Sequence, residues 1–155
     1  MIQCTVEGPV TGRRYDVVLP LWGAHQAANA ATAIGLLEAA GVELAPATVR
    51  RALWGLRLPG RIEVRGRRPW LIVDVAHNAV SARALAEVLR AASPRAADPW
   101  VLAREARGPA LVAPSVAAAL EAARRLAGPR DAVVVTGSFY VAGEALAFLD
   151  ARRDG

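Results

Sequence analysis

The first part of the chain has the pattern of a β-hairpin. Apolar and polar residues alternate over 2–6 and again over 15–19, the period expected of strands with one buried face. The segment 8–12 between them is rich in glycine and proline, which favour turns. Pro20 ends the second run. The pattern therefore predicts two short strands joined by a turn.

Two helices are predicted next. An alanine-rich stretch over 23–40 favours a helix with an apolar face, and Gly41 is a natural end for it. A shorter helix is predicted over 46–53, because a proline suits a first helical turn. The Leu-Pro-Gly sequence at 58–60 interrupts this pattern. We therefore predict a boundary between a first domain, 1–57, and a second, 58–155.

The second domain alternates strands and helices. Its runs at 70–74 and 131–135 are continuously apolar apart from an aspartate at the end of the first and at the start of the second, as in strands buried on both faces of a sheet. This order predicts a three-layer α/β fold with a mostly parallel sheet. The predicted strands are 62–64, 70–74, 99–103 and a run from 131 that leads into a Gly-Ser turn at 137–138, and the predicted helices are 81–92, 115–127 and 141–151.

The composition excludes several chemistries. The chain has 155 residues and a net charge of +5, and all 19 of its basic residues other than histidine are arginines. Without lysine it cannot form a Schiff base or carry the lysine of a phosphate-binding P-loop. A single cysteine, Cys4, excludes an intrachain disulfide, and two histidines leave little for a histidine-rich metal centre.

The arginine content is weak evidence for nucleic-acid binding, because alanine and arginine excess without lysine resembles a coding bias. Arg65, Arg67 and Arg68 are interpreted as surface residues or at most a weak nucleic-acid patch. The N-terminus lacks the features of a signal peptide, and no apolar run is long enough for a membrane span. We expect a cytoplasmic protein that binds neither nucleic acid nor membranes.

Two polar clusters follow the apolar strands. Asp74, His77 and Asn78 follow the first strand, and Ser138 and Tyr140 follow the second. Ligands of open parallel sheets bind at these carboxyl ends. Asp74 could accept hydrogen bonds from a ribose, and the Gly-Ser turn could bind a carboxylate or phosphate. The alternatives are a helix cap at 74–78 and an ordinary tight turn at 137–138.

Further candidates precede these clusters. His25 and Asn29 are four residues apart, so both can contact one ligand from one face of a helix, beside Gln26. Arg61 follows a Pro-Gly pair at the domain boundary, where its planar guanidinium could reach a phosphate. The alternatives are a solvent-facing helix start for the first group and a surface arginine for the second.

The order of these motifs resembles the C-terminal half of folylpolyglutamate synthase/dihydrofolate synthase, a family of the Mur ligase superfamily. The resemblance rests on four segments in the same order: LWGAHQAANA at 21–30, LPGRIEV at 58–64, VDVAHN at 73–78 and VTGSFY at 135–140. It implies a Mur ligase C-terminal domain of Rossmann-like fold at 58–155. It also implies that 1–57 is the tail of a central P-loop ATPase domain.

The resemblance implies a reaction and a role for each residue. The family uses ATP and Mg²⁺ to form an acyl phosphate on folate or dihydropteroate, and the amine of L-glutamate then displaces phosphate. By resemblance, His25, Gln26 and Asn29 lie near the adenine and Arg61 approaches the phosphates. Asp74 contacts the ribose, with His77 nearby on the ATP side. Ser138 and Tyr140 belong to the glutamate loop, and no residue here is a metal ligand.

Two departures from the family shape our expectation. First, the family's P-loop, metal ligands and carbamylated lysine belong to segments that precede the one matched by residue 1. Second, the segment 93–110 is too short for the further strand-helix unit that the family has there. We therefore expect a C-terminal half that is inactive alone and could need a separate N-terminal ATPase half. The alternatives are a non-catalytic nucleotide- or metabolite-binding module and a fragment of a Mur-type peptidoglycan-precursor ligase.

Overall fold

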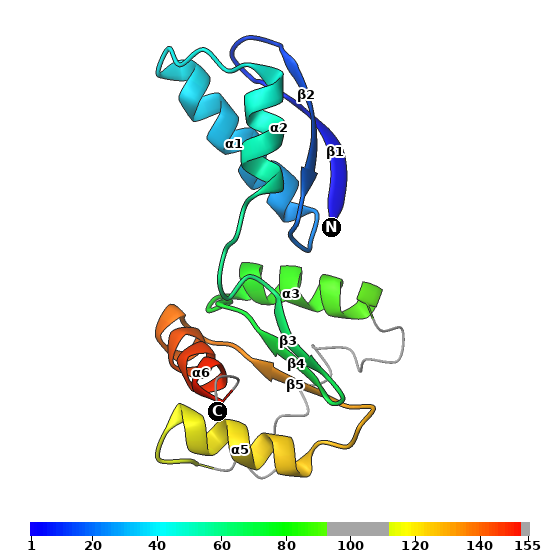
Figure 1. Cartoon of the computed structure of the whole chain (residues 1–155), viewed down its shortest axis with the longest axis vertical. Helices are drawn as coiled ribbons and strands as arrows, with labels where there is room; N and C mark the ends of the chain where they lie inside the picture. The colour runs from blue at the N-terminus through cyan, green and yellow to red at the C-terminus, as the bar shows by residue number, and fades with distance from the viewer. Residues whose placement is uncertain (93–111, 153–155) are drawn as a thin grey trace. The chain divides into compact units, whose positions relative to one another are not determined.

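The structure, a computed structural model, describes residues 1–92 and 112–152 (Figure 1). The chain divides into two compact units, Met1–Leu58 and Pro59–Gly155. The division falls one residue after the boundary predicted from the sequence. Each unit has its own hydrophobic clusters.

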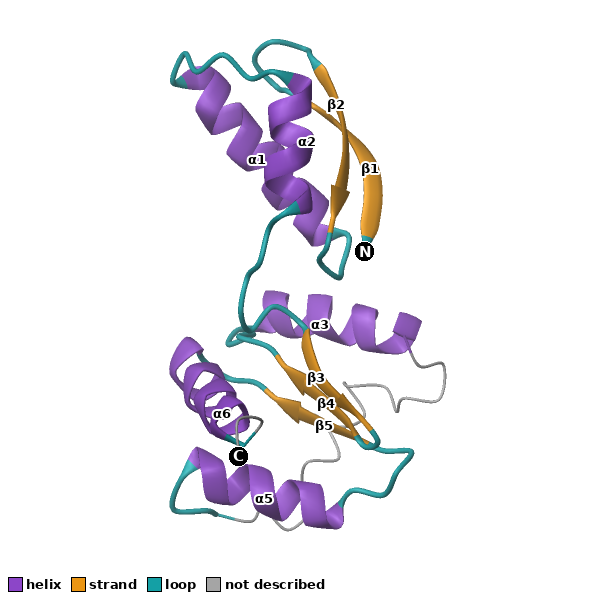
Figure 2. Cartoon of the chain, viewed as in Figure 1, coloured by secondary structure: helices purple, strands orange, loops and turns teal. Residues whose placement is uncertain are grey.

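Unit 1 is a β-hairpin covered by two helices (Figure 2). Strand β1, Ile2–Glu7, pairs antiparallel with β2, Arg14–Leu19. Helix α1 spans His25–Ala39 and α2 spans Pro46–Trp54. All four elements were predicted, with boundaries shifted by at most two residues. Gly41 adopts φ +75° after α1, a conformation that suits glycine and ends the helix.

The alternation of the two strands accounts for the core of unit 1. Val6 from β1 and Tyr15 and Val17 from β2 point to the same side, where they pack against Ile34 of α1 and Val49 of α2. Burial of each such side chain contributes roughly 1.5–3 kcal/mol relative to exposure. The hairpin alone would leave this face in water, so the helices are needed to stabilise it.

One carboxylate joins the hairpin turn to α1. Glu38, buried near the end of the helix, accepts hydrogen bonds from the Val10 and Thr11 backbone amides, the Thr11 hydroxyl and the Tyr15 hydroxyl. The Thr11 hydroxyl bond lowers the pKa of Glu38 below its ordinary value of 4.5, although burial acts against it. Burial, followed by Glu38 itself, raises the pKa of Tyr15 above 10.0.

This cluster predicts a pH-dependent stability. The ionised form of Glu38 is the one that the fold favours, so its stabilising effect is present above pH 4.5 and is lost as the pH falls through the lower pKa of the folded chain. We expect Glu38→Gln to lower the urea midpoint at pH 7 and to weaken its dependence on pH below 4.5. The exposed Glu43→Gln is the control. Equal pH profiles for E38Q and the unmodified chain would contradict the prediction.

Unit 2 contains a three-stranded sheet in the order β3-β4-β5. Strand β3, Glu63–Arg67, pairs antiparallel with β4, Trp70–Val73, and β4 pairs parallel with β5, Ala132–Val135. Among the described strands the sheet is therefore mixed, whereas a mostly parallel sheet was predicted. Only two residues separate β3 from β4, and a parallel connection needs a much longer crossover.

Helices cover both faces of this sheet. Helix α3, Ala79–Ala92, lies on one face, and α5, Val116–Leu126, and α6, Phe139–Ala151, lie on the other (Figure 1). Alternate residues of β4 serve the two cores: Ile72 packs toward α3, and Leu71 and Val73 toward α5 and α6. The α/β class and the three layers are confirmed, and so is the prediction of strands buried on both faces.

Some predictions lie beyond what the structure describes. The strand expected at 99–103 and the shortening expected at 93–110 fall in the stretch that is not described. Within 1–92 and 112–152, no helix combines the length and the apolar character that crossing a membrane requires.

Candidate functional site

Three segments of unit 2 meet at the carboxyl end of its parallel strands. They are the segment before β3, the loop after β4 and the loop after β5. The Val75 amide donates to the Gly60 carbonyl at 2.9 Å, and the Gly137 amide donates to the Ala76 carbonyl at 2.8 Å. The Thr136 hydroxyl also donates to Ala76, at 2.9 Å. These bonds hold the segments that carry Arg61, His77 and Ser138 in one place.

Asp74 connects two of these segments through hydrogen bonds of its carboxylate. Its side chain is buried, with 7% of the residue exposed. Oδ2 accepts from the Ile62 amide at 3.0 Å, and Oδ1 accepts from the Ala76 amide at 2.7 Å. Each carboxylate oxygen therefore already serves a backbone donor. In this conformation Asp74 joins two loops, and a ribose contact stays a prediction.

The backbone around Arg61 is unusual on both sides. Gly60 has φ +68° and Ile62 has φ +51°, the left-handed region that residues with a side chain rarely occupy. A Cβ atom at Gly60 would lie 2.9 Å from Cγ1 of Val75. The Asp74 bond to Ile62 holds the second of these residues. The start of the Arg61 side chain is thus determined by its neighbours.

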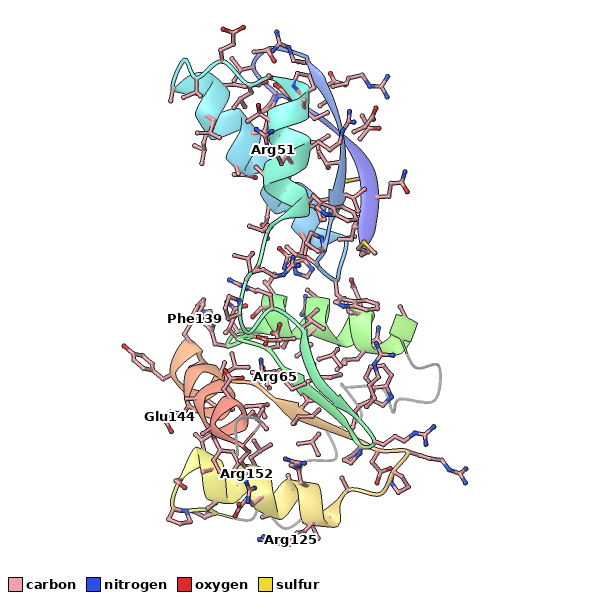
Figure 3. All side chains as sticks on the ribbon, viewed as in Figure 1. Arg51, Arg65, Arg125, Phe139, Glu144 and Arg152 are labelled. Atoms are coloured by element: carbon pink, nitrogen blue, oxygen red, sulfur yellow. The ribbon has the colours of Figure 1, made fainter. Side chains whose placement is uncertain are left out.

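An aromatic ring lies beside both Arg61 and His77. The Arg61 guanidinium carbon lies 5.5 Å from the centre of the Phe139 ring, within cation–π range. The His77 and Phe139 ring centres are 6.5 Å apart. Phe139 is 60% exposed and begins α6 (Figure 3). Sequence reasoning missed Phe139; an exposed aromatic directly after a helix-capping serine was the signal available.

One ring nitrogen of His77 has no hydrogen-bond partner among the described residues. Nδ1 lies 3.0 Å from the Val75 carbonyl oxygen. A carbonyl only accepts, so Nδ1 carries a hydrogen and Nε2 can accept a hydrogen bond. The histidine is exposed. It can therefore contact a polar ligand through Nε2.

Two of the polar residues cap helices, Asn78 as one interpretation of 74–78 predicted and Ser138 in place of the tight turn considered at 137–138. Oδ1 of Asn78, directly before α3, accepts from the Ser81 amide at 2.9 Å. Oγ of Ser138 accepts from the Val141 amide at 3.1 Å at the start of α6. Both serve as N-caps. The Ser138 hydroxyl can still donate one hydrogen bond, and Tyr140 is 85% exposed.

In unit 1, the three residues predicted to act together form one hydrogen-bonded chain. Nδ2 of Asn29 donates to Oε1 of Gln26 at 3.0 Å, and Nε2 of Gln26 lies 3.0 Å from Nε2 of His25. An amide nitrogen only donates, so His25 accepts at Nε2 and carries its hydrogen on Nδ1. Gln26 is buried, with 4% exposed. It therefore orients the two more exposed side chains.

These residues suit an anionic or polar ligand better than a metal. Arg61 and His77 supply cationic or hydrogen-bonding groups, and the start of α6 offers the positive end of a helix dipole. Within the part of the chain that the structure describes, no three histidine, cysteine or acidic side chains gather as a metal site would require. The chemistry available here is phosphate or carboxylate binding.

Comparisons with known proteins identify relatives. A probable bifunctional folylpolyglutamate synthase/dihydropteroate synthase of Haloferax volcanii is 32% identical over 84% of this chain and 20% of its own length. A dihydrofolate synthase/folylpolyglutamate synthase of Escherichia coli is 29% identical over 82% of this chain and 39% of its own length. No family model matches the chain.

Solved structures that resemble the chain carry the same folylpolyglutamate synthase name as these relatives. Mycobacterium tuberculosis folylpolyglutamate synthase complexed with ADP matches 95% of this chain and 44% of its own, with a TM-score of 0.74 and 27% identity. A bifunctional folylpolyglutamate synthase/dihydrofolate synthase with Mn, AMPPNP and L-glutamate bound matches 90% of this chain and 43% of its own, with a TM-score of 0.67 and 27% identity. The chain thus spans less than half the length of these relatives.

Proposed function

The chain is related in sequence and fold to the C-terminal portion of folylpolyglutamate/dihydrofolate synthases, and from this premise we propose that it contributes that portion of an ATP-dependent ligase. The ligase joins L-glutamate to a carboxylate of folate or dihydropteroate. The observation that carries the proposal is the similarity over more than four fifths of the chain.

Arg61 is proposed to contact the phosphates of ATP. Its guanidinium is permanently charged and can donate two parallel hydrogen bonds to phosphate oxygens. The left-handed residues on either side and the Phe139 ring restrict where it can lie. A restricted cation loses little entropy when it binds a transferring phosphoryl group, which is what catalysis of such a transfer requires.

The nucleoside part of ATP is assigned to the remaining polar residues. His77 is proposed as a ligand through Nε2, the nitrogen that its bond to Val75 leaves free. Asp74 is proposed to contact the ribose, which requires one oxygen to accept a hydroxyl beside its backbone donor. His25, Gln26 and Asn29 are proposed as the adenine side of the site, with Gln26 orienting the other two.

The glutamate substrate is assigned to the start of α6. Ser138 caps this helix and keeps a hydroxyl hydrogen that can be donated to a carboxylate. Tyr140 follows it and is exposed. A helix start attracts a negative group. These features support a site for the amino acid whose amine attacks the activated carboxylate.

In this proposal, this chain and a separate ATPase segment supply different parts of the active site. The described residues contain no metal cluster, and the chain contains no lysine. Mg²⁺ and the P-loop are therefore proposed to come from an ATPase segment, of which 1–57 is the tail. By itself the chain is expected to bind nucleotide weakly and to ligate nothing.

A chimeric enzyme tests this division. Residues 1–155 would replace the matching region of the Escherichia coli dihydrofolate synthase/folylpolyglutamate synthase, and ADP release would be measured with dihydropteroate, L-glutamate, ATP and Mg²⁺. We expect glutamate-dependent turnover by the chimera and none by the isolated chain. The E. coli protein without its matching region is the control.

Two outcomes would contradict the proposal. Turnover by the isolated chain would exclude the division of labour. A folded chimera without activity, together with an isolated chain that binds ATP with high affinity, would favour a non-catalytic nucleotide-binding module instead.

A further inference from the structure

A pocket lies at the end of the unit 2 sheet opposite to the candidate functional site. It has a volume of about 410 Å³, within the range of small-molecule sites. One side of the pocket is formed by the turn between β3 and β4, which lies at the start of β4. Helices α5 and α6 supply the rest. The proposed ligase site lies beyond the other end of this strand, where Asp74 follows it. The pocket is therefore separate from the proposed ligase site.

Arginines dominate the lining. Five of them come from three elements that are far apart in the sequence: Arg65, Arg67, Arg68, Arg124 and Arg152. We call this feature the arginine pocket. Leu71 and Leu149 add an apolar part to its lining. Scattered surface arginines would not converge on one hollow, so a coding bias toward arginine does not account for the arrangement.

Carboxylates neutralise only part of this charge. Arg65 is paired with Glu63 at 2.7 Å and with Asp150. Arg152 is paired with Glu121 at 2.9 Å, and its guanidinium lies 5.0 Å from the centre of the Phe148 ring. Both arginines are thus held in place by the fold.

The other three arginines have no carboxylate partner within the described residues. The Arg67 guanidinium lies 5.6 Å from the centre of the Trp70 ring. The side chains of Arg68 and Arg124 form no hydrogen bond or ion pair with any other residue that the structure describes. A bound anion would give these two like charges an opposite charge to contact. Guanidinium forks match phosphate and carboxylate oxygens in geometry.

We propose that the arginine pocket binds a small ligand that carries two or more closely spaced phosphate or carboxylate groups. Arg68 and Arg124 supply the free charges, and the paired Arg65 and Arg152 supply an ordered frame around them. The volume accommodates a compact polyanion together with a short apolar portion. This inference rests on unit 2 alone and does not depend on the proposed ligase function.

Calorimetric titration of the whole chain tests the proposal at fixed ionic strength. The probes are tripolyphosphate, citrate and orthophosphate. We expect one saturable site per chain and an affinity for the preferred polyanion about 10-fold or more above that for orthophosphate, a factor that corresponds to ~1.4 kcal/mol. Tighter binding of tripolyphosphate would identify a phosphate ligand, and tighter binding of citrate a carboxylate one.

Matched variants locate the site. We expect Arg68→Gln and Arg124→Gln each to weaken binding by about 10-fold, as expected for loss of a charge-assisted contact. Arg125→Gln removes the same charge from the next position of α5. Arg125 does not line this pocket, although it lines a smaller neighbouring hollow together with Arg124 and Arg152 (Figure 3). We expect R125Q to weaken binding clearly less than R124Q does. Arg61→Gln should leave binding nearly unchanged, because Arg61 belongs to the proposed ATP site.

The proposal would be overturned by the absence of saturable binding, by an equal loss in R124Q and R125Q, or by loss of binding in R61Q. The first result would exclude a site, the second would indicate a general charge effect, and the third would assign the polyanion to the ATP site. Circular dichroism monitors the fold of each variant. Should R124Q unfold, R68Q carries the test, because Arg68 lies in an exposed turn.

Discussion

Replacing Asp74 with alanine is expected to destabilise unit 2 by about 2–4 kcal/mol, because two buried backbone amides lose their acceptor and each unsatisfied donor costs about 1–3 kcal/mol. The amides are those of Ile62 and Ala76. Loss of the first also removes the hydrogen bond that helps to hold Ile62 in its left-handed conformation. Hydrogen exchange of the amides in β4 and β5 reports the stability of this unit within the whole chain.

Asp131→Ala is the matched control for this prediction. The Asp131 side chain also accepts a hydrogen bond from a backbone amide, that of Gly128 at 2.8 Å, but at an exposed position. Water can replace that bond, so the control should cost about 1 kcal/mol or less. Asp74→Asn keeps the shape with only one accepting oxygen and should fall between the two. Equal stability of D74A and D131A would contradict the inference that the two hydrogen bonds of Asp74 stabilise unit 2.

Replacing Arg61 with glutamine in the active chimera is expected to reduce turnover by about 10²–10³-fold, the usual effect of removing one preorganised group from a transition-state site. The reduction should appear in kcat more than in the KM for ATP, because the charge on the phosphoryl oxygens grows during transfer. Steady-state assays at several ATP concentrations separate the two.

Two companion variants make the Arg61 test specific. Arg61→Lys keeps the charge but loses the fork, so it should recover part of the activity. Arg57→Gln removes an exposed arginine whose side chain donates to the neighbouring Leu56 carbonyl, and should leave turnover unchanged. An unchanged kcat in R61Q would remove Arg61 from the proposed mechanism.

Local patterns in the sequence were sufficient for most of the fold. The apolar run of β4 predicted a strand buried on both faces, because helices on two sides require apolar residues at every position. The helix predicted at 115–127 begins with a serine, and Oγ of this Ser115 accepts from the Ala118 amide at 3.1 Å as an N-cap. Both signals depend on a few neighbouring residues. The antiparallel pairing of β3 follows from an equally local feature, the two-residue connection to β4.

The details of the site could not be predicted in the same way. Asp74 was interpreted as a ribose contact or part of a helix cap. Neither interpretation included the hydrogen bond that it accepts from Ile62, 12 residues earlier, and the ribose contact stays a prediction. Asn78 is the residue that caps the helix. Arg65, Arg67 and Arg68 were interpreted as ordinary surface residues, since the sequence does not reveal that Arg124 and Arg152 lie around the same pocket. Such relations exist only once the sheet and its helices have assembled.

The bonds between the loops also differ in how much chain they enclose. The Ile62–Asp74 bond spans 12 residues, whereas the Thr136–Ala76 bond spans 60. Loop-closure entropy grows with the logarithm of length, so the longer closure costs about 1.4 kcal/mol more. The half of the candidate site that holds Arg61, Asp74 and His77 can therefore form within a local hairpin. The half that holds Ser138 forms only when β5 pairs with β4, so its formation during folding costs more conformational entropy.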